Sequence, residues 1–123
     1  MKIHYVKCPD GAKLFSFYRH HYNEHDGCFI DGGFDYIRHN GELCSDDIFD
    51  VISDIRTRFY WGVRYDKDGD RLPQTTPTLL KDLSTSHIHN ILSDMIDSIG
   101  NSDIKNRVPI LSIFINELKY RLK

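Results

Sequence analysis

This 123-residue chain has few cysteines, no long apolar run and no large excess of either charge. Cys8, Cys28 and Cys44 are odd in number and irregularly spaced, which excludes a disulfide framework and predicts free thiols in a reducing compartment. No apolar run approaches the roughly 20 residues of a membrane helix, and the N-terminus lacks the apolar segment of a signal peptide. We therefore expect a cytoplasmic protein without a membrane partner.

The balance of charge excludes a further class. Lysine and arginine total 16 against 18 aspartates and glutamates, which gives a net charge of −2 and an isoelectric point near 6.4. Without a basic field, phosphate contacts contribute little, so nucleic acid is disfavoured as the main partner. A hydrophobic content of 40% and a charged content of 28% are typical of a globular protein, and the length fits a single domain over residues 1–123.

Residues 1–44 are predicted to form a small antiparallel β lobe. Short apolar groups alternate with the turn sequences Pro9-Asp10-Gly11, Asp26-Gly27 and Gly32-Gly33, which is the pattern of short strands joined by turns. The two adjacent glycines permit positive φ, so we expect a tight turn or a small anion-binding nest there.

Residues 45–123 are predicted to be mainly helical, with one strand near 59–65. Apolar residues at helical spacing run from Asp46 to Arg58, and Ser45 is the expected N-cap. A tight turn ends the following strand. A loop that contains Pro73 and Pro77 comes next.

Two amphipathic helices are predicted at the C-terminus. Residues 84–99 keep strict one-face spacing, with Ser84 as cap and Gly100 as stop. Residues 104–122 place apolar side chains at alternating steps of four and three, and Pro109 starts the regular part of this helix or kinks it.

The predicted fold class follows from these segments. It is α+β, with a small N-terminal antiparallel β lobe packed on a helix, plus a C-terminal antiparallel helical hairpin. The apolar surface of the hairpin exceeds what one small lobe covers, which favours a homo-oligomer.

Zinc-type ligands gather in the first part of the chain. Cys8, His21, His25 and Cys28 are the candidates. A structural zinc site normally uses paired ligands on tight knuckles, whereas Gly11 stands where Cys8 would need a second cysteine. We therefore favour surface histidines and a buried Cys28 over a metal site, and we expect no cofactor.

Two sequence strings, residues 31–38 and residues 58–64, place aromatic residues beside arginine. Aromatic residues and arginine are the residue types most often found in binding hot spots. In the first string, Tyr36 would stack on a ligand while Arg38 pairs with it beside Asp31; the alternative is a hairpin turn whose aspartate caps its own backbone. In the second string, ligand stacking competes with a core strand flanked by solvated arginines. The candidate binding residues of the second string are Arg58, Trp61 and Arg64.

A third candidate surface is acidic. Asp46 and Asp50, with Phe49 beside them, would present negative charge to a basic site on another protein. The alternative is a solvated helix face that interacts favourably with the helix dipole. A catalytic cysteine needs a neighbouring general base and a cleft, and the sequence indicates neither for Cys28 or Cys44. We therefore expect no enzymatic activity.

The segment Phe29–Arg38, preceded by Arg19-His20-His21-Tyr22, resembles the Val-Asp-Gly-Gly-x-Asp-Tyr-x-Arg core of small uncharacterised proteins encoded by tailed bacteriophages. Residues 59–69, 80–92 and 117–121 are similar to a companion region of the same proteins. Many of those proteins carry paired cysteines in a zinc-ribbon-like element. Here the cysteine positions are occupied by Gly11, His25 and Gly27.

The resemblance implies a phage or prophage origin, and the family has no established activity to transfer. Small accessory phage proteins commonly serve host takeover or counter-defence. Our leading hypothesis is a non-catalytic protein that antagonises host defence or physiology by binding and occluding a bacterial host protein in the host cytoplasm. One alternative is an oligomeric sponge that sequesters a nucleotide immune signal, cyclic or not, between subunits. Tyr36 or Trp61 would then stack on the base, and Arg38, Arg58 or Arg64 would contact the phosphate. A further alternative is a zinc-ribbon-like structural or nucleic-acid-associated module.

Overall fold

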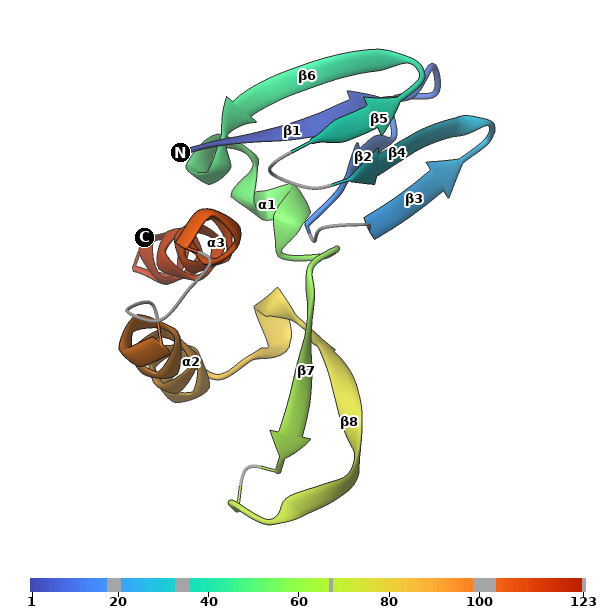
Figure 1. Cartoon of the computed structure of the whole chain (residues 1–123). Coiled ribbons are helices and arrows are strands. Elements are labelled where there is room, and N and C mark those ends of the chain that lie inside the picture. The colour runs from blue at the N-terminus through green and yellow to red at the C-terminus, as the bar shows by residue number, and fades with distance from the viewer. Residues whose placement is uncertain (18–20, 33–35, 67, 99–103, 123) are drawn as a thin grey trace.

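The computed structural model describes residues 1–17, 21–32, 36–66, 68–98 and 104–122, and it confirms the α+β class. The strands pair antiparallel in separate small sheets, and helices follow in the C-terminal part of the chain. In Figure 1 most strands lie together at one end of the molecule, while one long hairpin extends away from the rest.

The first sheet has β1 (Lys2–Lys7) at its centre, between β2 (Lys13–Phe15) and β6 (Glu42–Asp47). Successive side chains of a strand point to opposite faces. Ile3 and Tyr5 therefore enter the main core, whereas Val6 enters a smaller core on the other side of the sheet.

A second sheet covers that other side. It has the order β3–β4–β5 and consists of β3 (His21–His25), β4 (Cys28–Gly32) and β5 (Ile37–His39). The buried residues of this smaller core come from both sheets and the turn after β1: Val6, Cys8, Leu14, Cys28 and Ile30. The predicted β lobe is thus a pair of small sheets packed face to face.

The helix predicted after Ser45 is much shorter than expected, and its predicted cap is wrong. Ser45 lies in β6 and pairs with β1, so it caps no helix. Helical structure begins with η1 (Ile48–Val51) and continues in α1 (Ile52–Ile55). The ladder with β1 satisfies the backbone of β6, and this long-range pairing outweighs the local preference of serine and aspartate for a helix N-terminus. The β lobe therefore includes all of β6 and does not end at residue 44.

The strand predicted near 59–65 is confirmed as β7 (Tyr60–Tyr65), but the loop predicted after it is wrong. β8 (Arg71–Leu79) pairs antiparallel with β7 and contains both Pro73 and Pro77. Proline lacks the N–H that a central strand needs, yet an edge strand tolerates it because one side faces no neighbour. Each strand of this two-stranded sheet is an edge strand, so the prolines do not prevent pairing.

After the hairpin, η2 (Leu80–Asp82) leads into α2 (Thr85–Ser98). The predicted cap of α2 is confirmed, because the Ser84 hydroxyl oxygen accepts a hydrogen bond of 3.1 Å from the backbone N–H of His87. The predicted stop at Gly100 and the link to the next helix lie outside the described residues.

The last element is α3 (Ile104–Arg121), with Pro109 inside the helix. It packs into the main core beside Phe59, whose ring meets those of Phe17 and Phe114 edge to face at centroid distances of 5.2 and 5.7 Å. This core joins the first sheet, the helices and the base of the hairpin. Within the described part of the chain, no helix is both long enough and apolar enough to cross a membrane.

Candidate functional site

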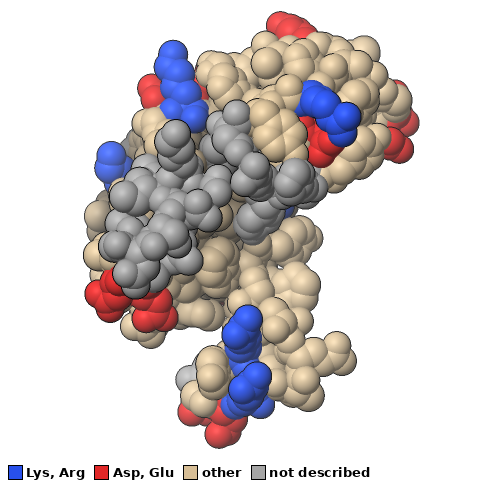
Figure 2. All heavy atoms as spheres, viewed as in Figure 1, with Lys and Arg blue, Asp and Glu red and all other residues tan. Residues whose placement is uncertain are grey.

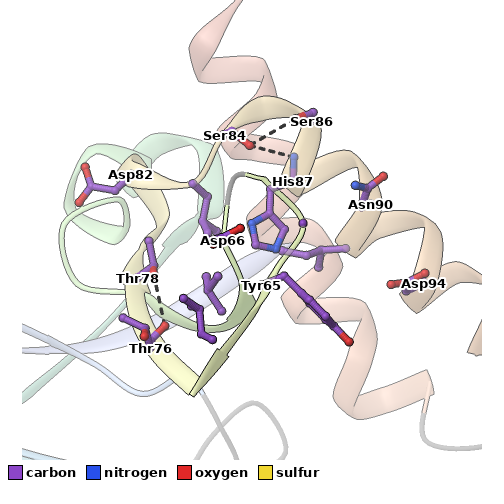
Figure 3. A pocket seen from close by; sticks show the side chains of 15 residues that line it. Tyr65, Asp66, Thr76, Thr78, Asp82, Ser84, Ser86, His87, Asn90 and Asp94 are labelled. Atoms are coloured by element: carbon purple, nitrogen blue, oxygen red, sulfur yellow. Dashed lines mark hydrogen bonds between the residues drawn. The ribbon is translucent and has the colours of Figure 1, made fainter. Parts of the chain in front are cut away.

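A groove of about 680 Å³ lies between the β7–β8 hairpin and α2 (Figure 3). One of its walls includes β8. The sequence predicts a loop with Pro73 and Pro77 there, so the groove could not be predicted from the sequence. The signal for the strand is the threonine-rich stretch around Thr76 and Thr78, because β-branched residues favour strands and two-residue spacing puts them on one face.

The hairpin wall is one face of the two-stranded sheet. Val63 and Tyr65 are two residues apart on β7, and Thr76 lies directly opposite Val63 on β8. These three residues and Thr78 all line the groove. The side chain of Tyr65 is 55% exposed, so its ring is available to a partner at the mouth of the groove.

The helix wall is one face of α2. His87, Asn90 and Asp94 line the groove. They lie on one face of the helix, because they are three, four and seven residues apart. Ile91 lies on the same face and is buried in the main core, which fixes this face toward the hairpin. Figure 3 shows His87 reaching from α2 toward Tyr65 and Asp66, with Asn90 and Asp94 further along the helix.

The groove is negatively charged. Among the described residues that line it, the charged side chains are Asp66, Asp82 and Asp94, and neither lysine nor arginine is present. The Oδ1 atom of Asp66 accepts hydrogen bonds of 2.9 Å from two backbone N–H groups of the β7–β8 turn, so this carboxylate is fixed in place. Asp82 lies 3.5 Å from the Nζ atom of Lys81, an exposed pair that offsets little of the field.

The hairpin itself stands out from the body as an arm (Figures 1 and 2). Arg64, Asp68, Asp70 and Arg71 are exposed near its end, where Figure 2 shows charged side chains of both signs. Neither outer edge of the hairpin has a neighbouring strand among the described residues.

The first predicted binding string lies in the second sheet, away from this groove. Arg38 and Asp31 face each other on β5 and β4 and form an ion pair, and this pairing raises the pKa of Arg38. Tyr36 is half-buried just before β5. The positive φ expected at Gly32 is confirmed at +125°, whereas residues 33–35 of the expected turn lie outside the described residues.

The second predicted string is divided between core and surface. The Trp61 ring packs edge to face on Phe114 at 5.1 Å, and it packs against the main core. Arg58 is paired with Asp54 at 3.3 Å, and Arg64 is exposed on the arm.

A second hollow, of about 560 Å³, is bordered by Arg58 and Lys13. Both cations are paired with Asp54, at 3.3 and 3.1 Å respectively. This shared aspartate neutralises part of the positive charge that a phosphate group would need.

The predicted acidic face does not form one helix surface. Asp46 lies in β6, where its carboxylate accepts a hydrogen bond of 2.5 Å from the Tyr5 hydroxyl and thereby raises the pKa of Tyr5. Phe49 packs against the main core, and Asp50 is exposed in η1. The physical reason is the strand pairing of β6, which removes Asp46 from the helix.

Two of the metal candidates meet in the smaller core. Cys8 and Cys28 are free, buried thiols, and burial followed by a hydrogen bond with Cys28 raises the pKa of Cys8 to about 11. The side chain of His21 lies outside the described part of the structure.

The remaining metal candidate, His25, pairs with an acid. Its Nε2 atom lies 2.6 Å from Oδ2 of Asp10, which raises the pKa of His25 and lowers the pKa of Asp10. One group of three described side chains has its potential ligand atoms within 4.8 Å of one another, and it consists of Asp10, His25 and Asp26. Neither cysteine belongs to this group. Among the described candidates, the two cysteines and His25 are therefore not brought together as one set.

Comparison with known proteins identified no relative of this chain. No protein-family model matches the chain, and neither a curated protein nor a solved structure is significantly similar to it. The chemistry of the groove and the arm is therefore the basis on which a function is argued. This chemistry combines an apolar floor, exposed hydroxyl and phenol groups, and negative charge.

Proposed function

We propose that this chain is a non-catalytic accessory protein of a tailed bacteriophage, and that it acts in the cytoplasm of the infected host by binding a host protein and occluding its working surface. The observation that carries the proposal is the projecting β7–β8 arm, which borders the groove together with α2. The phage origin rests on the resemblance of Phe29–Arg38 to the phage family.

The composition of the groove supports binding to a protein. Val63, Leu72 and Ile91 supply apolar surface, and Thr76 and Asn90 supply polar side chains in the same groove. Protein interfaces combine apolar and polar groups in this way. Tyr65 adds the type of aromatic side chain that most often dominates binding energy in such interfaces.

Native mass spectrometry of the tagged protein purified from a bacterial host lysate tests the proposal. We expect a host protein in fixed stoichiometry with the wild-type chain, and loss of that protein with Tyr65→Ser. Tyr22→Ser is the matched control, because Tyr22 is 54% exposed on β3 and Tyr65 is 55% exposed on the arm. The control variant should retain the host protein.

Other masses would contradict the proposal. A lone oligomer that carries a nucleotide-sized adduct would favour the sponge, and stoichiometric zinc would favour the zinc-ribbon-like module. A host protein that is retained by Tyr65→Ser would place the interface away from the arm.

A further inference from the structure

We infer that two copies of this chain pair through the open edges of their β7 strands, antiparallel about a two-fold axis at Gly62. The two arms then form one sheet with the strand order β8–β7–β7–β8. This partner is additional to the host protein of the proposed function, and it uses the strand edge rather than the groove. The inference depends on the direction of the main-chain groups of β7, on the register of β7 against itself, and on the charges at the two ends of the arm.

The main chain of β7 presents hydrogen-bonding groups at its open edge. The N–H of Leu80 donates to the carbonyl oxygen of Phe59 at 2.9 Å, so the main chain of Phe59 faces β8. Successive residues of an antiparallel strand alternate in this respect, and the main-chain groups of Tyr60, Gly62 and Arg64 therefore face away from β8. No strand in the described part of the chain lies on that side.

The position of Pro77 agrees with this direction. Pro77 lies opposite Gly62, so its main chain also faces away from the hairpin partner and its missing N–H removes no bond between β7 and β8. The register shifts between Val63 and Tyr65, but the extra residues belong to β8. The alternation along β7 therefore continues to its end.

One register pairs all three outward-facing residues of β7. With the axis at Gly62, this residue lies opposite Gly62 of the second copy, and Tyr60 lies opposite Arg64 of the second copy. Each of these pairs exchanges two main-chain hydrogen bonds. A shift of two residues in one direction would place Arg64 opposite Arg58 of the second copy, where like charges repel. A shift in the other direction would leave Tyr60 beyond the end of the neighbouring β7.

Charge complementarity favours a second copy as the occupant of this edge. At the base of the arm, Lys13 and Arg58 share Asp54, so one positive charge remains. At the end of the arm, residues 66–71 contain three aspartates against one lysine and one arginine, so one negative charge remains. Antiparallel pairing brings the end of each arm to the base of the other, and it places Asp66 opposite Arg58 of the second copy.

Pairing at β7 also closes the assembly. The outer strands of the combined sheet are the two copies of β8, and the prolines Pro73 and Pro77 hinder the addition of a further strand there. The expected assembly is therefore a dimer and not a filament. A two-stranded sheet is only marginally stable by itself, and the arm projects from the body (Figure 1), so strand addition stabilises it.

Sedimentation equilibrium of the purified full chain tests the dimer. We expect a mass twice the 14.4 kDa of the monomer at high protein concentration. Tyr60→Lys should weaken dimerisation about ten-fold, because it sets a lysine opposite Arg64 of the second copy and the axis repeats this contact. Tyr22→Lys is the matched control, since Tyr22 is 54% exposed on β3 and Tyr60 is 52% exposed on β7.

Two further variants separate a broken interface from a misfolded arm. Tyr60→Glu sets opposite charges across the same pair and should tighten dimerisation. Combining Tyr60→Lys with Arg64→Glu should restore the wild-type mass. Hydrogen exchange followed by mass spectrometry should be slower over residues 60–65 in the wild type than in Tyr60→Lys, with equal exchange over residues 2–7.

Three results would overturn the inference: a monomeric mass at the highest soluble concentration, equal effects of Tyr60→Lys and Tyr22→Lys, or equal weakening by Tyr60→Lys and Tyr60→Glu. The proposed function is tested separately, by capture of a host protein. A monomer that captures the host protein keeps the proposed function and removes the dimer. A dimer that captures none keeps the dimer and removes the proposed function.

Discussion

The carboxylate of Glu117 has no exposed surface, and its Oε1 atom accepts a hydrogen bond of 2.5 Å from Nε of Arg56. Its Oε2 atom accepts a second one of 2.9 Å from Nε of Arg121. Arg121 also donates to the Leu80 carbonyl at 3.0 Å. One buried carboxylate thus joins the end of α1, η2 and α3, and its charge is stable there because two guanidinium groups replace water.

Glu117→Gln is expected to lower the free energy of unfolding by about 3 kcal/mol, because two partly buried arginines lose their counter-charge. Urea denaturation followed by circular dichroism measures the change. Glu24→Gln is the control: Glu24 is exposed, so the same chemical change should cost less than about 0.5 kcal/mol. Equal losses in the two variants would show that the buried ion pairs contribute little.

Gly32→Ala is expected to destabilise the second sheet. Gly32 has φ of +125°, and a Cβ atom there would lie 2.1 Å from the carbonyl oxygen of Tyr36. Strain and overlap together should cost more than about 2 kcal/mol in thermal or urea unfolding. Gly11→Ala separates the two causes, because Gly11 has φ of +91° but open space around the added atom. If both variants lose the same stability, the close approach to Tyr36 plays no part.

The pair formed by His25 and Asp10 predicts a pH dependence at the turns of the β lobe. The pKa of His25 is raised above 6.5, so this residue stabilises the fold below pH 6.5 and the contribution is lost as pH rises through the raised pKa. The pKa of Asp10 is lowered below 3.8, so its contribution is present above that value and is lost as pH falls through the lowered pKa. Titration of the His25 ring by NMR checks this. Asp10→Asn should bring the His25 pKa down, whereas Asp97→Asn should leave it unchanged; an unchanged value in Asp10→Asn would contradict the pairing.

Charge reversal should have different consequences at Asp46, which lies in β6, and at Asp50, which lies in η1. Asp46→Lys removes the acceptor of the Tyr5 hydroxyl and should cost about 1–2 kcal/mol in urea denaturation. Asp50→Lys changes an exposed residue and should stay within about 0.5 kcal/mol. Asp50→Lys is therefore the clean test of an acidic interface at η1. Retention of the host protein by this variant would leave the arm and groove as the interface.

The elements that the sequence predicts correctly are those in which local pattern and tertiary packing agree. α2 is one such element, because Ser84 caps it and Ile88 and Ile91 enter the core at helical spacing. β7 is another. The turn glycines also follow from local chemistry, since Gly11, Gly27 and Gly32 all have positive φ.

The elements that it predicts wrongly are those that depend on a distant strand. Ser45 and Asp46 favour a helix N-terminus locally, but β1 is available as a partner and draws them into β6. Pro77 favours a loop locally, but it lies opposite Gly62 at the outer strand of a hairpin, where the missing N–H is tolerated. Since the groove depends on that hairpin, the sequence alone did not reveal it.

The sequence by itself determined the α+β class, the capped start of α2 and the turns at Gly11 and Gly27, because these follow from side-chain periodicity and from the backbone preferences of single residues. Only the tertiary structure decided that Glu117 is a buried ion-pair partner, that Trp61 belongs to the core, and that three aspartates face one groove. Each of these depends on which elements pack together. Hydrogen bonds and burial between residues far apart in the chain set that packing, and local propensity does not encode it.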